Sequence, residues 1–354
     1  MGHPHASRKE EIPSLNGWRA VALILVVLTH ANLVPGGFGI LAVMIFFFLS
    51  GYLITTLMME DAIEKGSIHL GKFYLRRFLR LMPPLFVTLS IAYPLVGLGI
   101  VSGRTGLAGF LSLLFSYHNY FYLFLDHADS VPLGLGICWT LAVEEHFYLV
   151  LPILLAVMLR RRAMGRTKYL MAALCVVVLV WRIVLSTVLY ADFDRIYYAT
   201  DTRIDSILFG CLLALWKPPV KTEHPERWGT LHHVLISVSA AALAASFLLR
   251  NEEFRKTFQF SVVGLALMPL FHFSIRFPDS SVFRLLNHRV LSRIGSMSYT
   301  IYLVHCLVLF NIGKWVPGRL WGLLLSLVLI GAYALLMERY VELPFRTMRR
   351  RLHR

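Results

Sequence analysis

An arginine and a histidine lie in the first apolar segment of the chain, residues 17–34, where a membrane helix would ordinarily carry no ionisable side chain. Ten residues separate Arg19 from His30, so a helix would place both side chains on roughly one face, about 16 Å apart along its axis. An ionisable residue in a membrane span costs about 2.5 kcal/mol or more and by default marks a functional site that faces the bundle interior. The structural alternative is that His30 hydrogen-bonds a neighbouring helix and Arg19 extends to the headgroups.

A second pair of cations, Arg77 and Arg80, precedes Pro83-Pro84 at the beginning of a later apolar segment. Residues three apart on a helix are neighbours on one face. Two adjacent guanidinium groups suit a diphosphate, because each can bind phosphate oxygens in a bidentate manner. The alternative is an anchor on anionic lipid headgroups, and spacing alone favours that simpler interpretation.

Two adjacent acids, Glu144 and Glu145, follow Trp139 a short way into another apolar segment. Their side chains point about 100° apart round a helix, so one can face the bundle interior while the other reaches the interface. We expect Glu144 to face the interior, where it could orient His30 or hold a proton for it. A solvated interfacial acid is the better interpretation of Glu145.

Two further groups of polar residues lie in apolar surroundings. Arg203 and Asp205 are at the start of a segment that continues into Gly210, and they could form a self-contained ion pair or belong to a site. His305 lies among apolar residues near the end of the chain. For a lone histidine in such a place, a structural hydrogen bond is the favoured interpretation.

The composition indicates a membrane protein, because 57% of the 354 residues are hydrophobic and only 16% are charged. The net charge of +15 does not indicate nucleic-acid binding, since the basic residues cluster in short loops between apolar segments, as loops that set membrane orientation do. The four cysteines lie in apolar runs without a CxxC pair. We therefore expect neither a disulfide framework nor a metal site.

We predict an all-α polytopic membrane bundle with about ten spans and both termini in the cytoplasm. The aromatic stretch 106–125 is long enough to cross, but we expect it to be re-entrant or interfacial, because 25 of the 35 Lys and Arg residues then lie on the cytoplasmic side. The chain is expected to form one domain, 1–354, with a cytoplasmic N-terminal tail, 1–16, a basic tail, 338–354, and no fused extracytoplasmic domain. The predicted spans are 17–34, 39–58, 82–101, 138–159, 169–190, 204–216, 231–249, 258–275, 294–312 and 320–337.

Taken in order, these residues resemble the acyltransferase 3 family of bacterial membrane O-acyltransferases along essentially the whole chain. One departure is Thr140, where the family usually has serine; the hydroxyl is kept. The matching stretches are Arg19 with His30; Phe47-Phe48-Leu49-Ser50-Gly51-Tyr52; Arg77-x-x-Arg80; Trp139-Thr-Leu-x-x-Glu144-Glu145-x-Phe-Tyr148; Thr202-Arg203-x-Asp205; Ser298-Tyr299-x-x-Tyr302-Leu-x-His305; and Glu342-x-Pro344-Phe345.

The resemblance implies transfer of an acyl group, often acetyl, from cytoplasmic acyl-CoA to a hydroxyl of a cell-envelope glycan, a lipid-linked sugar or a natural product. Such an enzyme lies in the bacterial inner membrane among its lipids, uses acyl-CoA as a donor substrate and has no tightly bound cofactor. His30 would then be the general base, because histidine exchanges protons near neutral pH, and Glu144 would orient it. The remaining assignments are donor binding for Arg19, Arg77 and Arg80, and acceptor or structural roles for Trp139, Glu145, Tyr148, Arg203, Asp205 and His305.

A proton-coupled secondary transporter or exporter is the main alternative, because it too has about ten spans with buried ionisable residues. Transporters of that kind usually show two related halves with broken helices at corresponding positions. The sequence shows no such symmetry, and a transporter needs no site for the anionic phosphates of acyl-CoA. The sequence does not specify the acceptor.

Overall fold

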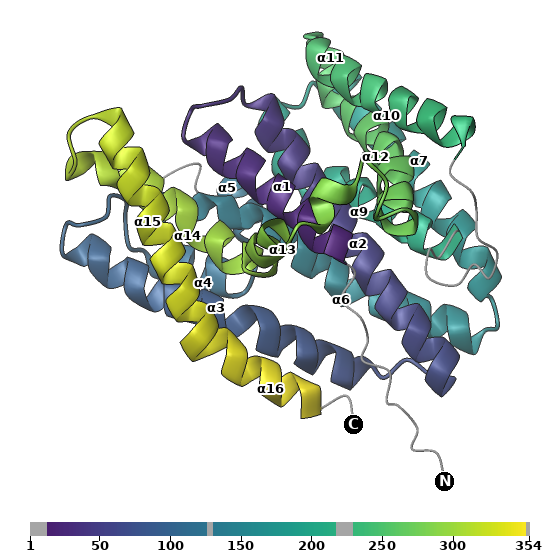
Figure 1. Ribbon diagram of the computed structural model, residues 1–354, viewed down its shortest axis with the longest axis horizontal. Helices are drawn as coiled ribbons and strands as arrows, with labels where there is room; N and C mark the ends of the chain where they lie inside the picture. The colour runs from purple at the N-terminus through teal and green to yellow at the C-terminus, as the bar shows by residue number, and fades with distance from the viewer. Residues whose placement is uncertain (1–12, 126–129, 217–228, 352–354) are drawn as a thin grey trace.

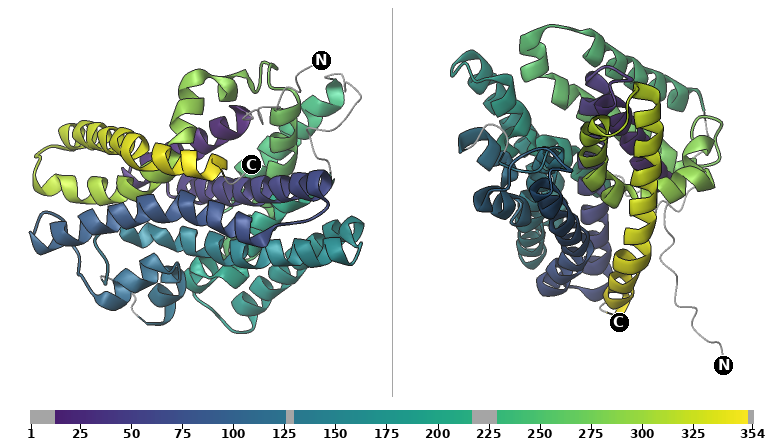
Figure 2. Two further views of the ribbon diagram at one scale, coloured as in Figure 1. Left: turned by 90° about the horizontal axis from the view of Figure 1, so that it is seen from below. Right: turned by 90° about the vertical axis from the view of Figure 1, so that its left-hand side faces the viewer.

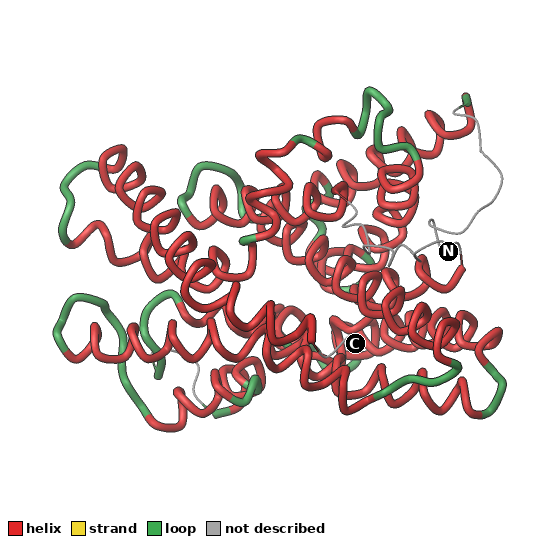
Figure 3. Tube along the Cα trace, turned by 60° about the horizontal axis from the view of Figure 1, so that its bottom comes forward, coloured by secondary structure: helices red, strands yellow, loops and turns green. Residues whose placement is uncertain are grey.

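The computed structural model describes residues 13–125, 130–216 and 229–351, and the predicted all-α fold is confirmed over these ranges. Helices connected by loops make up the described chain (Figure 3), and the one β-bridge recorded there pairs Gly103 with Pro132. The shorter helical elements are α8 (Phe193–Tyr198), α11 (Glu252–Lys256), η1 (Leu135–Cys138), η2 (Arg284–Asn287) and η3 (Ile312–Lys314).

All ten segments that the sequence predicts as spans fall on helices. Among the described residues, seven helices are long and apolar enough to cross a membrane, or eight if the pair α13 and α14, bent by 72°, forms one span; α1 and α9 are shorter. The chain is therefore a multi-pass membrane protein. The helices that carry the ten predicted segments are α1 (Pro13–His30), α2 (Gly37–Lys65), α3 (Leu70–Gly97), α6 (Trp139–Arg160), α7 (Met164–Thr187), α9 (Thr200–Trp216), α10 (Thr230–Leu248), α12 (Gln259–Arg276), α13 (Arg289–Ser296), α14 (Ser298–Asn311) and α15 (Arg319–Met337).

The aromatic stretch 106–125 forms two short helices, α4 (Leu107–Leu114) and α5 (His118–Phe124), of eight and seven residues. The turn between them includes Ser116 in the left-handed region, with φ of 55°. A helix needs about 20 residues to cross a bilayer, so neither of these helices can span it alone. This agrees with the prediction that the stretch does not form an ordinary span.

Helix α2 crosses the middle of the molecule and packs against α1, α6, α9 and α12 (Figure 1). Its closest neighbour is α9, because glycines lie where the two backbones meet. A Cβ atom on Gly51 would lie 1.9 Å from the carbonyl oxygen of Ile207, and one on Gly210 would lie 2.0 Å from that of Phe48. The small residues of this stretch are thus required for close helix packing.

The basic segment 338–354, which the sequence predicts to be a tail, continues the last helix as far as residue 351. Helix α15 continues through a π-helical turn, η4 (Glu338–Glu342), into α16 (Leu343–Arg351). Helix α16 packs against α3 (Figures 1 and 2). The basic segment is therefore, as far as residue 351, part of the helical bundle beside the arginines of α3.

Candidate active site

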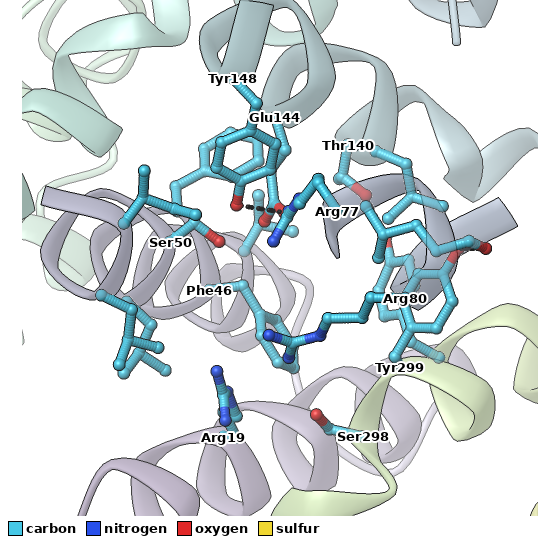
Figure 4. Close-up of a pocket in the computed structure, with 18 of the residues that line it drawn as sticks. Arg19, Phe46, Ser50, Arg77, Arg80, Thr140, Glu144, Tyr148, Ser298 and Tyr299 are labelled. Atoms are coloured by element: carbon cyan, nitrogen blue, oxygen red, sulfur yellow. Dashed lines mark hydrogen bonds and ion pairs between the residues drawn. The ribbon is translucent and has the colours of Figure 1, made fainter. Parts of the chain in front are cut away.

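Three arginines line two adjoining pockets of about 280 Å³ and 390 Å³, which we call together the arginine cavity. Arg19 comes from α1, and Arg77 and Arg80 come from α3. All three point toward the same space (Figure 4). The other polar residues that line the first pocket are Ser50, Thr140, Glu144, Tyr148, Ser298, Tyr299 and Tyr302. The cavity therefore brings together the three residues that the sequence predicts as donor-binding.

Side chains of α6 hold Arg77 in place. Its guanidinium lies 3.5 Å from Glu144 Oε2 and 3.5 Å from Glu145 Oε1, and its Cζ lies 3.5 Å from the centre of the Tyr148 ring. The Tyr148 hydroxyl donates to Glu144 Oε2 at 3.0 Å. Both acids thus fix one arginine, and Glu145 is not the solvated interfacial acid that the sequence suggested.

Arg19 and Arg80 have no carboxylate partner among the described residues. Arg19 Nη1 donates to Asn16 Oδ1 at 3.0 Å, a neutral partner. Arg80 has no hydrogen bond or ion pair in this part of the chain. Guanidinium groups that converge on a cavity in this way favour a ligand with several negative charges, because each can bind two phosphate oxygens.

His30 contacts His305 of α14, so the prediction that Glu144 orients it is wrong. His30 Nδ1 lies 3.0 Å from His305 Nε2, and His305 Nδ1 lies 2.7 Å from the carbonyl oxygen of Tyr302. A carbonyl only accepts, so His305 Nδ1 carries the hydrogen and its Nε2 accepts. His30 Nδ1 must then donate, which leaves Nε2 of His30 with a free lone pair.

A third pocket, of about 270 Å³, has His30 and several other aromatic rings in its lining; we call it the aromatic cavity. Trp139 lies 4.9 Å from the rings of both Tyr197 and Tyr198. The remaining aromatic residues of this lining are Tyr122 and Tyr302. Tyr197 and Tyr198 were not among the predicted site residues, although two adjacent tyrosines shortly before Arg203 were a visible signal.

The arginine cavity and the aromatic cavity adjoin each other, because Val43 and Tyr302 line both. Tyr302 is held by a 2.8 Å hydrogen bond between its hydroxyl and that of Thr140 and by a 3.1 Å bond that it donates to the carbonyl of Ile137. The hydroxyl of Thr140 thus makes the hydrogen bond to Tyr302 that a serine hydroxyl could make at this position. The side chains of Val43 and Tyr302 therefore separate the three arginines of one cavity from His30 in the other.

Arg203 and Asp205 do not pair in the way that the sequence suggested. Asp205 receives a hydrogen bond of 2.7 Å from Arg182 of α7, and both side chains are fully buried. Arg203 lies over the rings of Phe260 and Tyr197, with its Cζ 3.9 Å and 5.0 Å from their centres. Sequence reasoning missed the pairing of Arg182, although an arginine within an apolar segment was the available signal.

The group of metal-ligand type found among the described residues is His30, His305 and Cys306, whose ligand atoms all lie within 4.8 Å of one another. In tetrahedral zinc sites with bonds of about 2.0–2.1 Å, two nitrogen ligands lie roughly 3.3 Å apart. The 3.0 Å between the two imidazole nitrogens is typical of a hydrogen bond instead. We therefore interpret the pair as two neutral imidazoles joined by one hydrogen bond, from Nδ1 of His30 to Nε2 of His305.

Comparison with known proteins gives a match over most of the chain. A family model described as an acyltransferase domain, Acyl_transf_3, matches residues 12–337. A candidate O-acetyltransferase of Staphylococcus aureus strain COL is 28% identical over 357 residues, which cover 95% of this chain and 57% of that protein. O-acetyltransferase OatA of strain NCTC 8325 is 27% identical over 354 residues with the same coverage. The chain thus spans about 57% of the length of these relatives, and no solved structure matches it.

Proposed function

This chain belongs to the acyltransferase 3 family, and we propose that it is a membrane O-acetyltransferase that moves an acetyl group from cytoplasmic acetyl-CoA to a hydroxyl group. The observation that carries the proposal is the adjacency of the arginine cavity and the aromatic cavity, which share Val43 and Tyr302. An anionic donor and a hydroxyl acceptor could meet at that partition without sharing one pocket.

The proposed topology has ten spans and cytoplasmic termini, with α4 and α5 on the outer side. The distribution of Lys and Arg supports it, because basic residues favour cytoplasmic loops. In this orientation the arginine cavity opens near the cytoplasmic ends of α1, α3 and α16. The pair of His30 and His305 then lies in the outer half of the membrane, nearer to an acceptor that is lipid-linked or outside.

In the donor complex, Arg19, Arg77 and Arg80 bind phosphate oxygens of acetyl-CoA. The contacts of Arg77 with Glu144 and Glu145 support a fixed guanidinium at this place, and a fixed group loses less entropy when it binds a ligand. Glu144 and Glu145 are then positioning residues of the donor site. The flexible arm of the donor carries the thioester past Tyr302 toward His30.

In the transfer step, Nε2 of His30 takes the proton of the acceptor hydroxyl while the oxygen of that hydroxyl attacks the thioester carbonyl carbon. The carbon–sulfur bond of the tetrahedral intermediate then breaks, and the thiolate of CoA takes up the proton from His30. His305 fixes the tautomer that this requires, because its Nε2 accepts from Nδ1 of His30. The products are an acetyl ester and free CoA.

The acceptor occupies the aromatic cavity in this proposal. Aromatic rings offer flat apolar faces, and the few polar groups of a pocket fix the orientation of its ligand. Trp139, Tyr197 and Tyr198 would contact the acceptor, which we take to be a hydroxyl-bearing glycan, a lipid-linked sugar or a small natural product. The staphylococcal relatives are named O-acetyltransferases without naming an acceptor.

The experiment that tests this function uses the purified protein in proteoliposomes with radiolabelled acetyl-CoA and an extract of cell-envelope glycans and lipids. We expect CoA release together with label in alkali-labile esters of the acceptor fraction. The variant with both Arg77→Ala and Arg80→Ala should lose both signals at low donor concentration. If the wild-type protein neither binds acetyl-CoA nor transfers its label, the proposed function is wrong.

A further inference from the structure

A second pair of arginines faces the arginine cavity from the C-terminal helix. Arg346 and Arg349 are three residues apart on α16, so they are neighbours on one helical face, and both line the 390 Å³ pocket. Arg77 and Arg80, also three residues apart, line the same pocket from α3. Two helices therefore present the same pattern of cations to one space.

The turn before α16 is fixed by two carboxylates. Glu338 accepts from Arg293 of α13 at 2.7 Å, and Glu342 accepts from the hydroxyl of Thr300 of α14 at 2.5 Å. Both acids belong to the π-helical turn η4, and such turns occur frequently at functional sites. These contacts join the turn to α13 and α14, and α16, which follows the turn, packs against α3.

The cations around Arg349 favour a bound anion. Arg349 lines the same pocket as Arg77, Arg80, Arg346 and Glu342, so three like charges and one opposite charge act on it. Its Nε atom is buried and has no hydrogen-bond partner among the described residues. Like charges held close together are destabilising, and a phosphate that bridges α3 and α16 would offset this repulsion and pair the buried nitrogen.

We propose that Arg346 and Arg349 form a subsite for the 3′-phosphate of the donor nucleotide, while Arg77 and Arg80 bind its diphosphate. The inference rests on the proposed function, since acyl-CoA carries a diphosphate and a separate 3′-phosphate. The donor thus has two separate phosphate sites, the diphosphate and the 3′-phosphate, and each is bound by one pair of arginines. A phosphate monoester could also come from a lipid headgroup, so the test separates these two sources.

The test compares acetyl-CoA with 3′-dephospho-acetyl-CoA as donors for the protein reconstituted in phosphatidylcholine vesicles. We expect the wild-type protein to have a KM at least tenfold lower for acetyl-CoA. The variant with both Arg346→Gln and Arg349→Gln should lose this preference, because its KM for acetyl-CoA rises to that of the dephospho donor. The KM for the dephospho donor should stay within about twofold. Arg161→Gln, which removes an exposed cation between α6 and α7, is the matched control and should change neither value.

Adenosine 3′,5′-bisphosphate gives a second measurement that needs no variant. It should inhibit the wild-type protein competitively with acetyl-CoA at concentrations at least tenfold lower than adenosine 5′-monophosphate does. Equal KM values for the two donors in the wild-type protein would overturn the subsite while leaving the proposed acetyltransferase intact. If donor preference is absent and phosphatidic acid, whose headgroup is a phosphate monoester, competes with acetyl-CoA in the wild-type protein but not in the double variant, the arginines bind a lipid headgroup. A wild-type protein without acetyl-CoA activity would overturn both proposals.

Discussion

Replacing His305 tests whether the histidine pair works as one unit. In His305→Ala, Nδ1 of His30 loses the acceptor that lies 3.0 Å away, and His305 is fully buried, so water does not readily take its place. A buried donor left without a partner costs about 1–3 kcal/mol, which converts to roughly a 5- to 150-fold loss of rate if it falls on the transition state. Without His305, the tautomer of His30 with its hydrogen on Nδ1, which can accept a proton at Nε2, competes with the tautomer that has its hydrogen on Nε2.

The assay is steady-state acetyl transfer by purified His305→Ala and His305→Gln proteins in proteoliposomes. We expect kcat of the alanine variant to fall within the 5- to 150-fold range given above, while the KM for acetyl-CoA stays unchanged because His305 does not line the arginine cavity. A glutamine can present its amide oxygen to His30, so His305→Gln should recover part of the lost rate. If His305→Ala is well folded and keeps the wild-type kcat, or loses affinity for the donor instead, this role of His305 is refuted.

Three further substitutions test the donor site and the helix packing. Arg80→Gln should raise the KM for acetyl-CoA at least tenfold with little change in kcat, as measured by steady-state kinetics; Arg80→Lys should recover only part of this loss, because an ammonium group cannot bind in a bidentate manner. Glu144→Gln weakens the anchoring of Arg77 and should raise the same KM while leaving measurable kcat, whereas a large loss of kcat at unchanged KM would return Glu144 to the transfer step. Gly210→Ala places a methyl group 2.0 Å from a backbone oxygen and should lower the melting temperature in detergent, by a destabilisation of roughly 1–3 kcal/mol or more. Gly71→Ala, whose Cβ meets nothing within 4 Å, is its control.

The features that depend on local sequence patterns, such as the helices and the shared face of Arg77 and Arg80, could be predicted from the sequence. Apolar segments identified the helices because membrane burial requires long apolar runs, and the spacing of Arg77 and Arg80 placed both on one helical face. Their convergence with Arg19 on one cavity was expected only through the family resemblance. Periodicity alone does not specify which helices meet.

Partner choice across the bundle could not be predicted from local patterns. His305 is 275 residues from His30, and Glu144 was an equally reasonable partner by type and depth. Asp205 pairs with Arg182 of another helix instead of Arg203 two residues away, because the side chains point in different directions around α9. Helix α16 packs on α3 directly after the π-helical turn, and the sequence pattern did not indicate this turn.

The most direct test of the account is the transfer rate of His30→Ala, measured with radiolabelled acetyl-CoA beside the affinity of the same protein for that donor. General-base catalysis is typically worth 10²–10⁴-fold, so we expect the rate to fall by about 100-fold or more. Donor affinity should not change, because the arginine cavity does not include His30. A His30→Ala protein that inserts normally, binds acetyl-CoA and transfers acetyl groups at nearly the wild-type rate would contradict the central claim that His30 is the base.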